Sequence, residues 1–104
     1  MEAESTKIRE MLFVHLVSAL AASAMQQLGK LVNPLSGKTE MNLPGARATI
    51  DMLEMLRDKT KGNLNQDEEQ LLRSTLANLQ LNYVAEAQQK EKVQVEEKPT
   101  QDKV

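Results

Sequence analysis

Apolar residues recur at intervals of three and four in three long segments of this chain, and short polar segments separate them. This spacing places side chains along one side of an α-helix. It predicts helices over residues 6–32, 43–61 and 66–90, and an all-α fold in which three helices form one domain around a central helical hairpin. The residues expected to face the core are Phe13, Val17, Leu20, Ala21, Ala24, Leu28, Leu31, Ala46, Ile50, Leu53, Leu56, Leu72, Leu76, Leu79 and Tyr83.

Local signals predict where these helices begin and end. Pro34 ends the first helix, because a residue before proline avoids the helical conformation. Asn42 is expected to cap the second helix, with Pro44 in its first turn. Residues 1–5 are polar and expected to be disordered. Residues 88–104 lack apolar periodicity and are expected to be a fraying helix end with a disordered tail, so the three-helix domain spans residues 6–87.

The turn of the helical hairpin has a sequence signature of its own. Lys59 and Lys61 place positive charge at a helix C-terminus, and Gly62 can adopt the left-handed conformation that closes it. Asn65 can cap the next helix, while Glu68 can reach back to complete a capping box. We therefore expect a structural turn made of Lys59, Thr60, Lys61, Gly62, Asn63 and Leu64.

Each predicted helix carries more apolar residues than one core-facing stripe explains. The predicted interface residues among them are Leu12, Leu16, Met52, Met55 and Leu81. If an interface buried them, each would contribute about 1.5–3 kcal/mol, or roughly 8–15 kcal/mol together, against about 4–15 kcal/mol for the cost of association. The alternative is that three packed helices already cover most of these side chains.

Composition argues against several classes of function. With 13 basic and 15 acidic residues among 104, the net charge of −2 offers no basic excess to attract nucleic acid or an anionic membrane. The absence of cysteine excludes disulfides, thiolate catalysis and cysteine-bound zinc, and one histidine cannot form a histidine-rich metal site. Two aromatic residues leave little with which to stack bases.

Asp51, Glu54 and Asp58 share one side of the second predicted helix. Carboxylates so placed can bind a divalent cation or act in acid–base catalysis. Because Arg47 and Arg57 lie four and three residues away, we interpret the group as a solvated ion-pair face instead. We expect no metal site, no cofactor and no catalytic residue.

His15 has no nucleophile or metal ligand near it in the sequence. We interpret it as a residue at the rim of a helix contact. The alternative is a pH-sensitive interface, since small environmental changes move the titration of imidazole across physiological pH.

The basic turn admits a second interpretation. Lys59 and Lys61, with Arg57, could contact the phosphates of RNA or of the ribosome. Sequence-specific binding of DNA by a helix-turn-helix is not expected, because the helix after the turn opens with Asp67, Glu68 and Glu69. Helix capping is the main interpretation of this turn.

Residues 11–25 form an apolar run that ends in Ala22-Ser23-Ala24, which is similar to a signal-peptidase site. The ten residues before the run carry three acidic and two basic side chains, so the positive start of a signal peptide is missing. The run is also short for a membrane span and is interrupted by polar residues. We expect a cytoplasmic protein with no membrane span.

A set of residues resembles a known family, and its most specific part is the turn at residues 59–64. The other matching residues are Phe13, Leu16, Val17, Leu20, Ala21, Ala24, Leu28, Gly29, Ile50, Asp51, Leu53, Leu56, Glu68, Glu69, Leu71, Leu72, Leu76, Leu79 and Tyr83. Over residues 11–85 the chain resembles a bacterial small-protein family called domain of unknown function 1844. The resemblance implies this helical fold and a cytoplasmic bacterial setting, and it adds no activity or cofactor. Basic residues commonly stand in the family where this chain has Gln80 and Asn82, so a charge-based role for the third helix is not implied.

The function predicted from the sequence is a helical interaction module that self-associates or docks on a larger cytoplasmic protein. An accessory factor that binds RNA or the ribosome through the basic turn is the alternative. A metal-dependent enzyme is the third hypothesis and the least expected, because the sequence offers no set of nucleophile, base and orienting residue.

Overall fold

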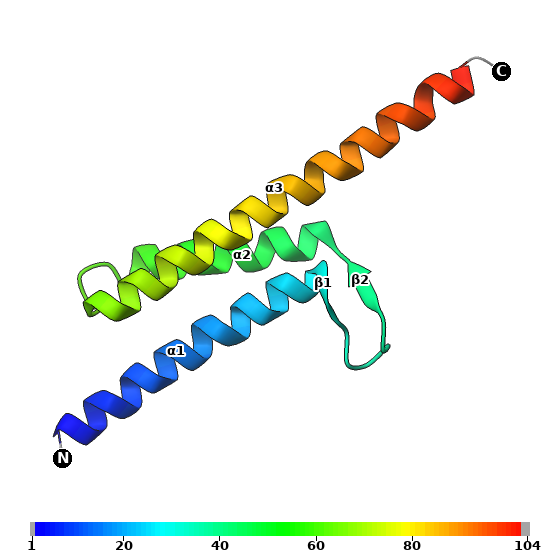
Figure 1. Cartoon of the computed structure of the whole chain (residues 1–104). Coiled ribbons are helices and arrows are strands. Elements are labelled where there is room, and N and C mark those ends of the chain that lie inside the picture. Colours follow the sequence, from blue (N-terminus) through cyan, green and yellow to red (C-terminus); the bar gives the residue numbers. More distant parts are fainter. Residues whose placement is uncertain (1, 103–104) are drawn as a thin grey trace.

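The computed structural model describes the backbone of residues 2–102 and the side chains of residues 2–91. Three helices, α1 (Glu2–Gln27), α2 (Leu43–Lys59) and α3 (Gln66–Asp102), contact one another. A two-stranded antiparallel sheet of β1 (Leu28–Val32) and β2 (Thr39–Met41) connects α1 to α2 (Figure 1). The fold is therefore predominantly helical, as predicted, but it is not all-α.

The first helix ends at Gln27 and not at Val32, where the sequence pattern placed its end. Gly29 has a φ of +77°, which lies outside the right-handed helix and which glycine adopts without steric cost. The Asn42 N–H donates a hydrogen bond of 2.7 Å to the Gln27 carbonyl oxygen and so brings the end of the sheet back to the end of α1. Residues 28–41 therefore form a β-hairpin instead of extending the helix.

The residues predicted to cap α2 and α3 do so. Asn42 Oδ1 accepts a hydrogen bond of 3.1 Å from the Gly45 N–H at the start of α2. Asn65 Oδ1 accepts from the Glu68 N–H at 2.8 Å, and Glu68 Oε1 accepts from the Asn65 N–H at 2.9 Å. The reciprocal bonds of the capping box are thus confirmed.

The turn between α2 and α3 is closed by backbone geometry. The Thr60 N–H and Oγ1 both donate to the Leu56 carbonyl oxygen, at 3.0 and 2.7 Å, so α2 ends at Lys59. Gly62 follows with a φ of +87°, the left-handed conformation predicted for it. Leu64 then packs against the core. These contacts support the structural interpretation of the turn.

Both ends of the chain are more helical than predicted. α1 begins at Glu2, inside the segment expected to be disordered, and α3 continues to Asp102, through most of the expected tail. The end of α3 extends past the other helices (Figure 1). Residues 85–98 are rich in alanine, glutamine, lysine and glutamate, so helix propensity favours a helix where packing does not. Residues 1, 103 and 104 lie outside the described residues.

The core lies where the three helices meet. Its buried members are Val17, Ala24, Leu28, Leu43, Ala46, Ile50, Leu53, Leu72, Leu76 and Leu79, with Phe13, Leu20, Ala21, Leu56 and Tyr83 partly buried against them. The predicted core stripes are therefore confirmed with one exception. Leu31 is 45% exposed, because it lies in β1 and not on α1.

A polar contact fixes how α1 lies against α2. The Gln27 side-chain amide lies 2.7 Å from the buried Thr49 Oγ1, and the same hydroxyl donates to the Gly45 carbonyl oxygen at 3.1 Å. A Cβ atom at position 45 would stand 2.9 Å from the Gln27 amide nitrogen and 2.5 Å from that of Asn42. A larger residue at position 45 would therefore displace the side chains of Gln27 and Asn42 from these contacts.

Replacement of Gly29 with alanine should lower the free energy of unfolding by roughly 1–2 kcal/mol, because an L-residue adopts a left-handed conformation only with a steric penalty of that size. Urea unfolding followed by circular dichroism measures the change. Leu35→Ala is the control, since Leu35 lies in the same hairpin at 96% exposure. Its effect should stay within about 0.5 kcal/mol. An unchanged midpoint for Gly29→Ala would argue that α1 continues as a helix through this position.

Candidate functional site

The residues predicted as an interface are all exposed in the single chain. The exposed fractions are 61% for Leu12, 45% for Leu16, 50% for Met52, 50% for Met55 and 72% for Leu81. The alternative, that the three helices cover these side chains, is therefore wrong for the isolated chain.

Leu12 and Leu16 belong to a longer strip on α1. Its members recur at alternating intervals of three and four, the spacing of helices that pack side by side: Arg9, Leu12, Leu16, Ala19, Ser23 and Gln26. Arg9 and Ala19 are exposed, while Ser23 and Gln26 are partly exposed. The strip has large apolar residues in its first half and small residues in its second.

Met52 and Met55 belong to a similar strip on α2. It consists of Gly45, Ala48, Met52, Met55 and Lys59, again at alternating intervals of three and four. Here the small residues come first in the chain and the large ones later. Ala19, Ser23 and Gly45 were not among the residues predicted for these strips, although each lies seven residues from a large member, Leu12, Leu16 and Met52 respectively.

The two strips lie side by side on one surface. Gln27 is three helical turns after Leu16, and it contacts Thr49 of α2. Met52 is one turn after Thr49, so both strips adjoin the α1–α2 contact. The buried residues of the two helices point toward α3, which leaves both strips facing away from it. We call this the α1–α2 surface, defined by the strips of residues 9–26 and 45–59.

Leu81 does not belong to the α1–α2 surface. It lies on α3 between the buried Leu79 and the partly buried Tyr83, and the helical turn directs it away from the core. Val84, three residues on, is 50% exposed on the same outer side of α3. Four of the five predicted interface residues therefore lie on the α1–α2 surface, and Leu81 lies apart from them.

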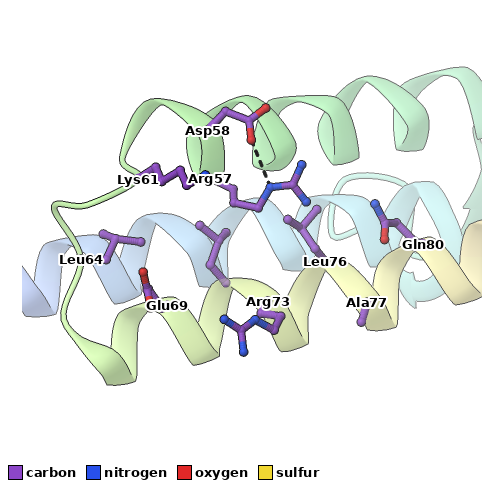
Figure 2. Close-up of a pocket in the computed structure, with 10 residues that line it drawn as sticks. Arg57, Asp58, Lys61, Leu64, Glu69, Arg73, Leu76, Ala77 and Gln80 are labelled. Atoms are coloured by element: carbon purple, nitrogen blue, oxygen red, sulfur yellow. Dashed lines mark hydrogen bonds and ion pairs between the residues drawn. The ribbon is translucent and has the colours of Figure 1, made fainter.

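The basic turn borders a groove of about 410 Å³ between α2 and α3 (Figure 2). Arg57, Lys61 and Arg73 line it, but Asp58 and Glu69 alternate with them, and Arg57 Nε forms an ion pair of 3.2 Å with Asp58. The floor contains leucines of the core, including Leu64, Leu72 and Leu76. The groove carries a small excess of positive charge over an apolar floor, which is a weak basis for phosphate binding.

His15 lies in a second groove, between α1 and α3, of about 750 Å³. It is exposed, and Lys7, Glu10, Asp67 and Glu68 line the same groove. Glu10 Oε1 accepts a hydrogen bond of 3.0 Å from the side chain of Asn65, which ties α1 to the start of α3. The structure thus places His15 at the rim of the α1–α3 contact, where the sequence analysis expected it.

The three carboxylates of α2 each have a partner. Asp51 pairs with Arg47 at 3.3 Å, and Asp58 pairs with Arg57. Glu54 Oε1 accepts a hydrogen bond of 2.7 Å from the Gln80 side chain on α3. Within the described residues, no group of three or more His, Cys, Asp or Glu side chains is placed to hold a metal ion. The pattern corresponds to the ion-pair face, with Glu54 used as a contact between helices.

α1 is long and apolar enough to cross a membrane, judged by length and composition alone. This differs from the expectation based on residues 11–25, because the whole helix has 26 residues. Core helices of globular proteins and signal sequences near an N-terminus satisfy the same criterion. In the structure Val17 and Ala24 of α1 are buried against the other helices, and most of its other apolar residues are exposed.

The comparisons with known proteins give one finding. Neither the curated proteins nor the solved structures contain a match to this chain. The model of one family, described as a domain of unknown function (DUF1844), matches residues 10–86, which include α1 from Glu10, the β-hairpin, α2 and the packed part of α3. With well over half of its length matched, the chain belongs to the DUF1844 family.

Proposed function

We propose that this protein is a small helical interaction module that binds another protein surface through its α1–α2 surface. The observation that carries the proposal is the pair of adjacent strips, in which four large apolar side chains stay about half exposed. Met52 and Met55 suit such a surface, because the flexible methionine side chain adapts to its partner.

The energy of burial supports the proposal. Covering the exposed half of Leu12, Leu16, Met52 and Met55 would contribute about 3–6 kcal/mol, since full burial of such side chains is worth about 1.5–3 kcal/mol each. A partner that buries a similar amount doubles this contribution. The sum of about 6–12 kcal/mol is comparable with the cost of association, about 4–15 kcal/mol.

The cytoplasm is the setting that we propose. Leu12 and Leu16 of α1 are then explained by the α1–α2 surface, and Val17 and Ala24 by the core, without a bilayer. Fractionation of cells tests this part separately: the protein should appear in the soluble fraction, and retention in carbonate-washed membranes would favour a membrane role for α1.

Leu16→Glu combined with Met52→Glu should abolish binding of the protein's partner, because both carboxylates would be buried without an opposite charge. The measurement is recovery of the complex by pull-down from the native lysate and by size-exclusion chromatography. Helicity by circular dichroism should stay near that of the unmodified chain, since both side chains are exposed. Loss of helicity together with binding would instead place them in the core.

Leu35→Glu is the matched control for this pair. It adds one negative charge, against two in the pair, at an exposed leucine in the β-hairpin and away from the α1–α2 surface. Binding should be unchanged. A loss of binding as large as that of the Leu16 and Met52 variant would mean that added charge, and not the surface, is responsible.

An accessory factor for RNA or the ribosome is the second candidate, because Arg57, Lys61 and Arg73 meet at the groove beside the turn. The test is Lys61→Glu with Arg73→Glu, which leaves Lys59 intact because Lys59 borders the α1–α2 surface. This candidate predicts an association that nuclease or high salt removes and that the variant weakens. Our proposal predicts that the variant and nuclease leave the association unchanged.

A further inference from the structure

We infer that the partner of the α1–α2 surface is a second copy of this chain, related by a two-fold axis that crosses the helices and makes α1 antiparallel to α1 of the other copy. The inference rests on the proposed function and specifies its partner. It also predicts that the four helices of the two surfaces form one additional core between the copies.

The size of the side chains favours this arrangement. On α1 the large residues Leu12 and Leu16 lie in one half of the strip, and the small residues Ala19 and Ser23 lie in the other. Antiparallel pairing places the large half of one copy against the small half of the other, twice. A two-fold interface needs a surface that is complementary to itself, and this strip has that property.

The strip on α2 has this property at Ala48 and Met55. Because the end of α1 adjoins the start of α2, the large residues Met52 and Met55 lie toward the end of the surface that carries Leu12. Gly45 and Ala48 lie toward the other end. A two-fold axis across the helices therefore sets Met55 against Ala48 of the other copy, while Met52, in the middle of its strip, lies against Met52 of the other copy.

Charge at the ends of the surface favours the same arrangement. Arg9 and Lys59 stand at the end with the large residues, while Gln26 and Gly45 stand at the other end. An axis across the helices sets each cationic end against an uncharged end. An axis along the helices would gather four cations at one end, and like charges placed together repel.

The area of the surface is sufficient for a dimer. Residues 9–26 span about 26 Å of helix, and two helices side by side are about 20 Å wide. Each copy therefore offers on the order of 500 Å², and the two together about 1,000 Å², which is the lower limit for a specific interface. The match is sufficient for a homodimer of moderate affinity, and a much larger partner is not required to cover the surface.

The first experiment measures the oligomeric state of the purified full-length chain by sedimentation equilibrium over a range of concentrations. We expect a reversible dimer, with twice the mass of the 11.6 kDa chain. Leu16→Glu with Met52→Glu should raise the dissociation constant at least about 100-fold, since each buried carboxylate without a partner costs at least about tenfold. Leu35→Glu, the control, should dimerise like the unmodified chain.

The second experiment determines the orientation, and the chain suits it because it contains no cysteine. Leu12→Cys and Ser23→Cys chains carrying different tags are treated with a short bis-maleimide, separately and as an equal mixture. In the antiparallel pair, two copies of residue 12 would lie about 16 Å apart along the helices, whereas residue 12 of one copy would lie beside residue 23 of the other. The yield of the cross-link between Leu12→Cys and Ser23→Cys should therefore be several-fold above that of either variant with itself. Equal or stronger cross-linking of each variant with itself would overturn the orientation.

The outcomes separate this inference from the proposed function. A monomer at all concentrations overturns the second copy as the partner. Suppose that the unmodified chain then recovers a protein from the native lysate and the Leu16→Glu, Met52→Glu chain does not. The interaction module then stands with a different partner. If both chains recover the same proteins, both the inference and the proposed function fail.

Discussion

A helix that packs into a three-helix core can bury one side only, and this constraint explains most of what the structure shows. The stripes around Val17, Ile50 and Leu76 meet in the centre and account for nearly all of the buried apolar residues. α1 and α2 each carry a second strip whose large apolar residues, Leu12, Leu16, Met52 and Met55, this arrangement of three helices leaves about half exposed. The exposed surface is therefore a consequence of the sequence, and we propose that a second copy of the chain covers it.

The contact between α1 and α2 determines how that surface is presented. Gln27, Thr49 and Gly45 hold the two helices in one rotation, and the β-hairpin holds their ends together. Because of this, two strips that are far apart in sequence lie on one face. A substitution at Gly45 would act on the surface through this contact, by displacing the side chains of Gln27 and Asn42 and not by removing an apolar side chain.

The sequence was a good guide to the helix caps and to the turn between α2 and α3, which depend on local chemistry. Asn42, Asn65, Glu68 and Gly62 act within a few residues of their own position, so their roles could be predicted. The β-hairpin could not, because Leu28 and Leu31 fit a helical pattern and the pairing of residues 28–41 depends on contacts across the hairpin. The large residues of the α1–α2 surface were predicted, but which of them lie together could be read only from the structure. Periodicity describes each helix separately and does not show which outer sides of different helices are adjacent. For this reason Leu81 was predicted together with the other four residues.

One measurement tests the central claim most directly, and the methionines make it specific. Methyl NMR of the labelled methionines, recorded over a dilution series of the purified chain, reports each position separately. Our account predicts concentration-dependent shifts for Met52 and Met55, while Met11 and Met41, which are 70% and 50% exposed but lie elsewhere, stay constant. Shifts confined to Met11 or Met41, or no shifts at any of the four, would contradict self-association through the α1–α2 surface.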